Sequence, residues 1–277
     1  MRYILILTIL LFYCRFGAST ISDDFYNFIV SNYGKATAQL IARKDFGSSG
    51  SYGGGQHQPG RKTPRRPVIF VHGMMTKAST TFQWDIQMKN YMPRRTEPAG
   101  PNGFPIQAAM RCQHVKGVRA LIEVVSNYTN SDVDVVTYSL GGPIARKAIL
   151  GGKCVDTGEN LGGSLTSIVQ TYLGVAGPQH GAVTCGGFGV GVCNRINGIG
   201  CNSRFLNDIN SRTRYEGSKI YVLQSTSDEI VGLNSCGTRS SEIRGQDRAV
   251  TVNGLGHVQT CATTSRIQYN LLNKGTQ

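Results

Sequence analysis

The sequence predicts an α/β fold, with a mostly parallel β-sheet and helices on both of its faces. Short all-apolar segments such as Val68–Val71 suit strands that are buried on both faces of a parallel sheet. Segments with helical periodicity, such as residues 112–126, alternate with these strands along the chain. A hydrophobic fraction of 40% is large enough to fill the core of such a fold.

Each element is predicted from its local pattern. Alternating or continuous runs of β-branched and apolar residues predict strands over 68–71, 133–138, 168–176, 219–224 and 249–252. Apolar residues at helical spacing predict helices over 22–46, 112–126, 140–150 and 259–272. In the first of these helices Ser22 is the expected N-cap.

The N-terminal region differs in composition from the rest. Residues 1–19 combine a charged start, a short apolar run and small residues, which predicts a signal peptide too short to span a bilayer. Residues 20–66 are expected to be a helix followed by a flexible Gly/Arg-rich linker, and residues 67–277 form the main domain. No later apolar run has membrane length, so we expect a secreted, extracellular protein without a transmembrane segment once the signal is removed.

The cysteines favour the same compartment. Seven of the eight lie beyond the signal, which predicts up to three disulfides and one remaining thiol. Many pairings are possible, and the expected ones are Cys112–Cys154, a pair within Cys185, Cys193 and Cys201, and Cys236–Cys261. No metal site is expected, because there is no C-x-x-C pair and no His at a ligand spacing from a Cys. The sequon that begins at Asn127 adds support for the secretory route.

The charge is strongly basic. The full chain carries a net charge of +13, and removal of Arg2 and Arg15 with the signal leaves +11. This balance favours an anionic lipid or glycan surface as a partner. Nucleic acid is not expected, because the compartment is wrong and no recognised nucleic-acid-binding module is present.

The segment Thr137-Tyr138-Ser139-Leu140-Gly141-Gly142 has the pattern of a nucleophile elbow. Ser139 follows a predicted strand and opens a predicted helix, which would hold its hydroxyl at the carboxyl edge of the sheet. The alternative is that Ser139 simply caps the helix. A similar pattern at 49–53 lies in the linker and lacks this context.

A serine nucleophile needs a base, and the base needs an orienting acid. On an elbow of this kind the chain order is Ser, acid, His. His257, between the last predicted strand and the last helix, is therefore favoured over His180 as the base. Asp228, which follows the strand at 219–224, is the expected acid, with its neighbour Glu229 as the nearest rival and Asp208 and Asp247 as more distant ones.

Two backbone N–H groups are expected to form an oxyanion hole. One belongs to Leu140, directly after the serine. The other belongs to Met74, in the loop that follows the first strand of the main domain. His72, in the same loop, is expected to support the turn rather than to exchange protons.

These segments carry a family resemblance. Residues 68–74, 133–149, 175–181, 228–232 and 254–257 resemble the class 2 lipases, which include small bacterial triacylglycerol lipases and secreted nematode lipase-like proteins. The resemblance covers about residues 67–270 and is nearest to the nematode branch. It implies an α/β-hydrolase fold, hydrolysis of carboxylic ester bonds in acylglycerols without a cofactor, and the triad Ser139, Asp228 and His257. Thr137 stands where the bacterial proteins have Ala or Gly.

Other functions use the same residues. A carboxylesterase acting on short-chain soluble esters is the nearest alternative, and an acyltransferase or thioesterase could use the same triad. A non-catalytic protein that binds lipid or glycan on a hydrolase scaffold is the third, but it would not need all three triad residues. The apolar loop at 186–192 is expected either to form part of an acyl-chain pocket or a small lid beside the site, or to be a plain disulfide-braced loop.

Overall fold

The computed structural model describes residues 21–44, 51–54, 57–74, 92–95, 109–186 and 189–275. The predicted signal peptide, the first two residues of the motif at 49–53, and Phe188 of the loop at 186–192 lie outside the described residues. Within the described ranges, no helix combines the length and apolar character that crossing a membrane requires.

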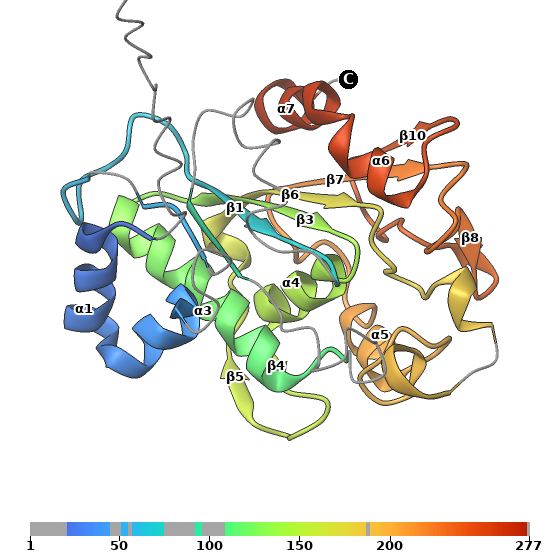
Figure 1. The fold of residues 1–277 in the computed structure, drawn as a ribbon, viewed down its shortest axis with the longest axis horizontal. Helices are drawn as coiled ribbons and strands as arrows, with labels where there is room; N and C mark the ends of the chain where they lie inside the picture. Colours follow the sequence, from blue (N-terminus) through green and yellow to red (C-terminus); the bar gives the residue numbers. More distant parts are fainter. Residues whose placement is uncertain are drawn as a thin grey trace, which may run out of the picture.

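A parallel six-stranded sheet forms the centre of the molecule (Figure 1), which confirms the α/β prediction. The strand order across the sheet is β10-β7-β6-β3-β1-β2, and every neighbouring pair is parallel. The strands are β1 Val68–Val71, β2 Met92–Arg95, β3 Val133–Tyr138, β6 Val169–Val175, β7 Lys219–Ser225 and β10 Arg248–Val252. Two small antiparallel hairpins lie outside this sheet: β4 Gly152–Lys153 with β5 Asn160–Gly162, and β8 Asn234–Ser235 with β9 Thr238–Arg239.

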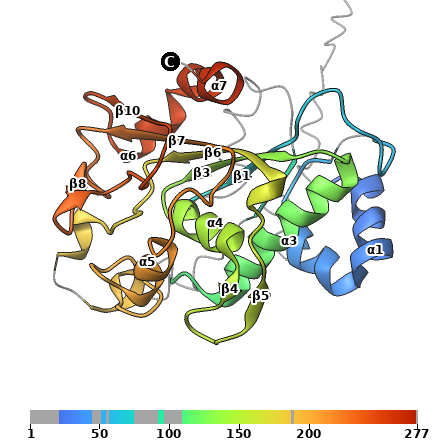
Figure 2. The same ribbon diagram turned by 180° about the vertical axis from the view of Figure 1, so that it is seen from behind.

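Helices cover both faces of the sheet (Figures 1 and 2). One face carries α3 Cys112–Thr129 and α4 Gly141–Leu150, with α1 Asp23–Ala42 packed on α3 and α5 Arg204–Ile209 on α4. The other face carries α6 His257–Ala262 and α7 Ser265–Lys274. Among the described residues, short 3₁₀ helices lie in the loops at Thr166–Ile168, Val183–Cys185 and Gly191–Cys193.

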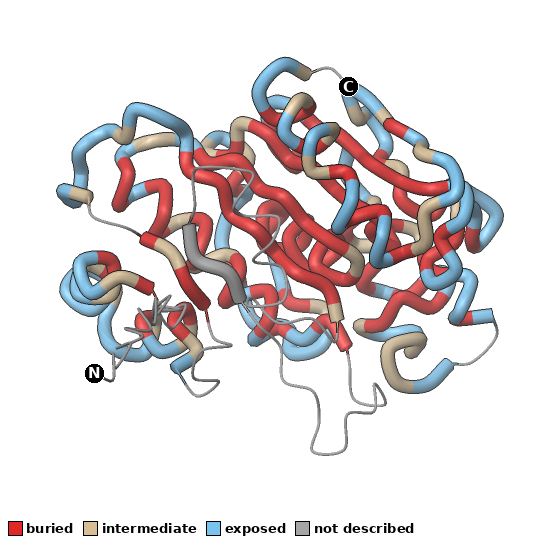
Figure 3. The backbone as a smooth tube through the Cα atoms, turned by 45° about the horizontal axis from the view of Figure 1, so that its top comes forward, coloured by how far each residue is buried: buried red, intermediate tan, exposed pale blue. Residues whose placement is uncertain are grey.

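The all-apolar strands are explained by these two layers. Ile69 and Val71 of β1 belong to the core under α3 and α4, whereas Val68 and Phe70 belong to the core under α6 and α7. Successive side chains of a strand point to opposite faces, so a strand covered on both faces needs apolar residues at every position. Figure 3 shows the central strands buried along their length.

Several elements differ from the prediction: helix α5 and the two small hairpins were not predicted, and neither was one strand of the main sheet. Strand β2 at the edge of the sheet was not predicted, because its sequence Met-Pro-Arg-Arg has neither alternation nor β-branched residues. The closing helix predicted over 259–272 is two helices, which separate at Thr263 and Thr264. The Thr264 hydroxyl donates to the Thr260 carbonyl oxygen at 2.6 Å, so local side-chain bonding accompanies the break.

The segment predicted to be a flexible linker is held in place where it is described. The Ser22 N–H donates to the Gly53 carbonyl at 2.8 Å, and the Thr63 N–H donates to the Thr129 carbonyl at 3.2 Å. The rings of Phe25 on α1 and Tyr128 on α3 lie 4.8 Å apart in the same region. Backbone hydrogen bonds, which composition does not reveal, therefore join α1 and the linker to α3.

Three disulfides form, and two of the expected pairings are confirmed. Cys112–Cys154 joins the first turn of α3 to the hairpin β4–β5, and Cys185–Cys193 closes the loop at 186–192. The expected Cys236–Cys261 pair is wrong: Cys236, in the turn of the β8–β9 hairpin, bonds to Cys201. Cys261 is a buried thiol because α6 turns it into the core above the sheet, away from that hairpin.

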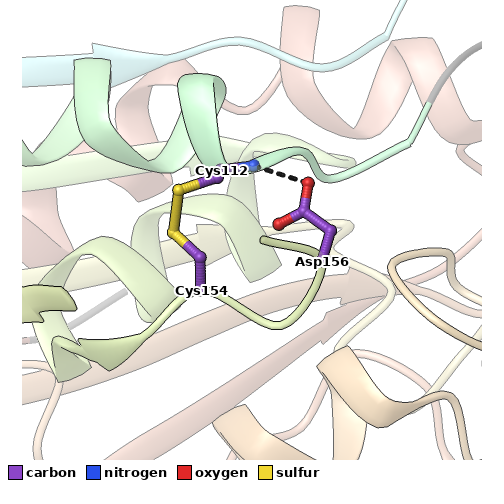
Figure 4. Close-up of side chains that lie close together, drawn as sticks. All are labelled: Cys112, Cys154 and Asp156. Carbon is purple, nitrogen blue, oxygen red and sulfur yellow. Dashed lines mark hydrogen bonds between the residues drawn. A yellow bond between two sulfur atoms is a disulfide. The ribbon is translucent and has the colours of Figure 1, made fainter. Parts of the chain in front are cut away.

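Asp156 lies beside the first of these disulfides (Figure 4). Its carboxylate accepts a hydrogen bond of 3.0 Å from the Cys112 N–H at the start of α3. The N-cap residue there is Arg111, whose guanidinium cannot accept a hydrogen bond from the first N–H groups of the helix. The two sulfurs are bonded to each other, so this cluster is a helix cap beside a cross-link and not a set of metal ligands.

The strand order reverses direction at the carboxyl ends of β1 and β3. After β1 the chain adds β2 on one side, then returns to place β3 on the other side and continues outward in that direction. Ligands of open α/β sheets bind at such a reversal point. The two loops that leave the sheet there contain His72, Gly73 and Met74, and Ser139 and Leu140.

Candidate active site

Ser139 lies on a sharp turn between β3 and α4. Its φ angle is 52°, in the left-handed region that costs a non-glycine residue energy. The turn is fixed by the Ser139 N–H, which donates to the Val175 carbonyl at 2.9 Å, and by the Gly142 N–H, which donates to the Ser139 carbonyl at 2.9 Å. The surroundings therefore hold a strained backbone that raises the serine side chain above the sheet.

Glycines make this close packing possible. A Cβ atom at Gly141 would overlap the Val71 and His72 carbonyl oxygens, so the start of α4 fits against the loop after β1 only without a side chain. A Cβ atom at Gly73 would lie 2.6 Å from the Cβ atom of Ser139. The loop after β1 thus passes directly against the nucleophile candidate.

His257 links Ser139 to Asp228. Its Nε2 lies 2.9 Å from Ser139 Oγ, and its Nδ1 lies 2.8 Å and 3.0 Å from the two carboxylate oxygens of Asp228. A carboxylate only accepts hydrogen bonds, so Nδ1 carries the proton and Nε2 accepts from the serine hydroxyl. The structure therefore brings the three predicted residues together, from the ends of β3, β7 and β10.

Asp228 is itself held by the loop that carries it. The N–H groups of Ile230 and Val231 donate to its Oδ1 at 3.0 Å and 2.8 Å. Burial opposes ionisation of this carboxyl, but the hydrogen bond and charge of His257 and the two backbone donors outweigh it, so the pKa of Asp228 lies below its usual value. The carboxylate is ionised at neutral pH.

Tyr138 supports the imidazole from one side. Its ring centroid lies 5.0 Å from that of His257, with the planes tilted by 33°. Burial raises the pKa of the Tyr138 phenol, so the ring remains neutral beside the histidine.

The rival residues have other partners. The His180 ring lies 3.4 Å from the Asn210 side-chain amide, and burial together with the charge of Arg146 lowers the His180 pKa. Asp208 pairs with Lys147 at 2.6 Å, and Asp247 pairs with Arg214 at 3.1 Å.

Glu229 lies at the site in a way that the sequence did not reveal. Its carboxylate oxygen Oε2 accepts from the backbone N–H of His257 at 2.8 Å, whereas the ring nitrogens of His257 bond to Asp228 and Ser139. Its position next to Asp228 marked it only as a rival acid.

Met74 and Leu140 lie in the two loops that meet at Ser139. Leu140 directly follows the serine and is the N-cap residue of α4, where unpaired N–H groups and the helix dipole favour negative charge. Met74 follows Gly73, which packs against Ser139. His72 Nδ1 donates to the Gly73 carbonyl at 2.7 Å, which supports the turn as expected.

Thr137 fits beneath the elbow by hydrogen bonding. Its hydroxyl lies 3.2 Å from the Tyr172 hydroxyl on β6, and the Tyr172 hydroxyl donates to the Gly142 carbonyl at 3.1 Å. The threonine thus joins β3, β6 and the first turn of α4, and its hydroxyl is satisfied in the buried position it occupies.

A second buried cluster lies behind the site. Arg146 of α4 contacts Glu216 through Nε at 2.9 Å and Nη2 at 2.8 Å. Its remaining donors reach Asn210 Oδ1 at 2.8 Å, Gln179 Oε1 at 3.4 Å and the Ile209 carbonyl at 2.8 Å. This cluster joins α4 to the loops on either side of α5.

Comparisons with known proteins agree with this architecture. The lipase B of Aspergillus fumigatus superposes with a TM-score of 0.58 at 16% identity, covering 85% of this chain and 58% of that one, so the chain spans a little over half of that lipase. The mature Bacillus licheniformis lipase BlEst2 superposes with a TM-score of 0.52 at 14% identity, covering 80% of this chain and 96% of that one. At these identities the likeness establishes the α/β-hydrolase fold.

Among curated protein sequences, none matches the chain. The family model of the class 2 lipases, in contrast, matches residues 65–270, which is most of the chain. The chain therefore belongs to the class 2 lipase family.

Proposed function

We propose that this protein is a secreted lipase that hydrolyses the ester bonds of acylglycerols through Ser139, Asp228 and His257. The observation that carries the proposal is the continuous contact of His257 with both partners, 2.9 Å to the serine hydroxyl and 2.8 Å to the carboxylate. Nucleophile, base and orienting acid are thereby in hydrogen-bond contact in the order that acyl transfer requires.

In the first half of the reaction, His257 Nε2 takes the proton of Ser139 Oγ as the oxygen attacks the ester carbonyl carbon. Asp228 stabilises the imidazolium that forms. The backbone N–H groups of Met74 and Leu140 hold the developing oxyanion. His257 then gives its proton to the leaving alcohol oxygen, and the acyl group remains on Ser139.

In the second half, water replaces the alcohol. His257 takes a proton from this water, whose oxygen attacks the acyl carbon, and the fatty acid leaves as the proton returns to Ser139. These steps use only side chains, backbone N–H groups and water, so the reaction calls for no cofactor.

Apolar side chains beside the triad favour a lipid over a small soluble ester. Val183, Ile230 and Val258 are large apolar residues with exposed fractions of 46%, 42% and 64%. Ile230 and Val258 follow closely on Asp228 and His257, and the Thr184 hydroxyl donates to the Ile230 carbonyl at 3.1 Å, which brings the loop of Val183 alongside. Exposed apolar groups gathered at one site commonly mark contact with an apolar partner.

The disulfides and the charge support the remaining parts of the proposal. Three disulfides suit an oxidising compartment and hence secretion. The net charge of +11 that remains once Arg2 and Arg15 leave with the signal favours approach to anionic lipid or glycan surfaces.

The test is hydrolysis of p-nitrophenyl esters of graded acyl length and of emulsified triacylglycerol by the purified mature protein. We expect activity on long acyl chains and on the emulsion, and a loss of at least about 10⁴-fold in Ser139→Ala. Activity confined to short soluble esters would indicate a carboxylesterase instead. Equal rates in the wild type and Ser139→Ala would rule out the triad.

A further inference from the structure

We propose that Glu229 is a positioning residue for the histidine: it fixes the backbone of His257 while its neighbour Asp228 fixes the ring. This inference rests on the proposed function, because it assigns a role within that triad.

Helix α6 begins at His257 without an N-cap side chain of its own. The N-cap residue is Gly256, so no side chain at that position can accept from the first N–H groups of the helix. The carboxylate of Glu229, 28 residues earlier in the chain, accepts instead from the first of these groups, the His257 N–H, at 2.8 Å. A negative group is also favoured at the positive end of a helix.

The position of the imidazole depends on this backbone contact. The ring must reach Ser139 with Nε2 and Asp228 with Nδ1 at the same time. Asp228 restrains only the ring, which can still shift if the backbone that carries it moves. The two consecutive carboxylates therefore have different roles: Asp228 holds the side chain of the histidine, and Glu229 holds its main chain.

The loop that carries Asp228 and Glu229 is itself held by hydrogen bonds, so it can position His257. The N–H groups of Ile230 and Val231 bind the Asp228 carboxylate, so the loop is braced on the far side of Glu229. The loop that carries Asp228 and Glu229 is thus tied to His257 at both the ring and the main chain.

Gly256 provides an independent means of disturbing Glu229. A Cβ atom built on Gly256 would lie 2.9 Å from Glu229 Oε2, and its three nearest neighbours are all atoms of that carboxylate. The φ angle of Gly256 is −67°, which alanine adopts without strain. Gly256→Ala therefore acts on the molecule mainly by displacing the carboxylate of Glu229.

The first measurement compares Glu229→Ala with Glu229→Gln. Glu229→Ala removes the acceptor, and we expect kcat to fall about tenfold or more with KM little changed, because misplaced catalytic groups slow the chemical step. Glu229→Gln keeps an oxygen that can accept from the His257 N–H, and should restore most of kcat. Equal losses in both variants would contradict the role of the acceptor oxygen.

The second measurement is a double-mutant cycle. Gly256→Ala alone should lower kcat, whereas Gly256→Ala added to Glu229→Ala should cost nothing further, because the group it displaces is gone. Additive losses would show that position 256 acts independently of Glu229 and would overturn the inference.

Controls separate this inference from the proposed function. Glu159→Ala removes an exposed carboxylate on the β4–β5 hairpin and should retain the kcat of the wild type. Hydrogen exchange at the His257 amide gives a readout without substrate: exchange should be faster in Glu229→Ala than in the wild type and slow again in Glu229→Gln. If the wild type had no Ser139-dependent activity, the proposed function would be wrong. The hydrogen-exchange rates would then still show whether Glu229 accepts a hydrogen bond from the His257 amide. If the wild type were active and Glu229→Ala matched it, only the role of Glu229 would fail.

Discussion

Two buried clusters in this protein pair a carboxylate with a nitrogen-bearing side chain: Glu216 with Arg146, and Asp228 with His257. They differ in how completely their hydrogen-bonding groups are used. In the Arg146 cluster, every side of the guanidinium contacts an acceptor, namely Glu216, Asn210, Gln179 or the Ile209 carbonyl. In the triad, Asp228 is satisfied from three directions, but the chain of contacts ends at the half-buried hydroxyl of Ser139.

The role of a buried polar group follows from how many of its hydrogen-bonding atoms have fixed partners. A guanidinium that is saturated with fixed partners cannot exchange protons or bind anything new, so it holds elements together. A histidine with one fixed partner and one partner at the surface has a proton to exchange and a direction in which to pass it. The two clusters should therefore respond in opposite ways to loss of their acid.

The largest effect is expected for Asp228→Asn. The amide keeps the shape and one acceptor oxygen, but its NH₂ group favours the wrong tautomer of His257, so kcat should fall about 10⁴-fold while the unfolding free energy changes little. Ester hydrolysis and denaturant unfolding measured on the same preparation check both parts. A kcat near that of the wild type would mean that another carboxyl orients the histidine.

The second effect is on stability. Glu216→Gln leaves the buried Arg146 without its counter-charge, and the unfolding free energy should fall by about 3–5 kcal/mol. The folded fraction should keep a kcat close to that of the wild type, since Glu216 contacts no residue of the triad.

A matched control replaces both members of that pair. Arg146→Met combined with Glu216→Leu removes both charges at once and should cost less than Glu216→Gln alone. If the double variant were less stable than the single one, the cluster would contribute net stability beyond avoiding an unpaired charge.

The smallest effect concerns acid stability. The His180 pKa is lowered by burial and by Arg146, with Glu242 acting in the opposite sense. The unfolded chain therefore binds a proton at higher pH than the folded one, and stability declines as pH falls below about 6.5. Between about pH 7 and pH 5.5, His180→Asn should lose less stability than the wild type in denaturant titrations at each pH. If the unfolding free energy of His180→Asn fell with pH as steeply as that of the wild type, groups other than His180 would cause the loss of stability in acid.

The main sheet could be predicted because its signals are local, and the meeting of Ser139, Asp228 and His257 could be predicted from one local motif and from chain order. Strand β3 and the elbow follow from one continuous segment, with apolar residues buried on both faces and a serine at the turn into α4. His257 and Asp228 follow from chain order, since the carboxyl ends of parallel strands meet at one edge of the sheet.

What escaped prediction depends on contacts between distant segments. The Cys201–Cys236 bond depends on where the β8–β9 hairpin lies against the loop before α5. The spacing of the cysteines in the sequence does not show that position. The same holds for Glu229, whose acceptor role exists only because α6 begins 28 residues later with a glycine before it. Composition also suggested a loose linker where backbone hydrogen bonds fix residues 51–54 and 60–63.

The placement of the three cross-links has a practical consequence for producing the enzyme. Cys185–Cys193 and Cys201–Cys236 restrain loops at the carboxyl edge of the sheet, whereas Cys112–Cys154 joins the start of α3 to the β4–β5 hairpin, and none of the three lies within the sheet. A bacterial cytosol that keeps thiols reduced will therefore yield a chain whose central strands can pair but whose binding edge is unrestrained. Expression routed through the periplasm or the endoplasmic reticulum is the appropriate choice, and specific activity per milligram, rather than soluble yield, is the quantity by which preparations should be compared.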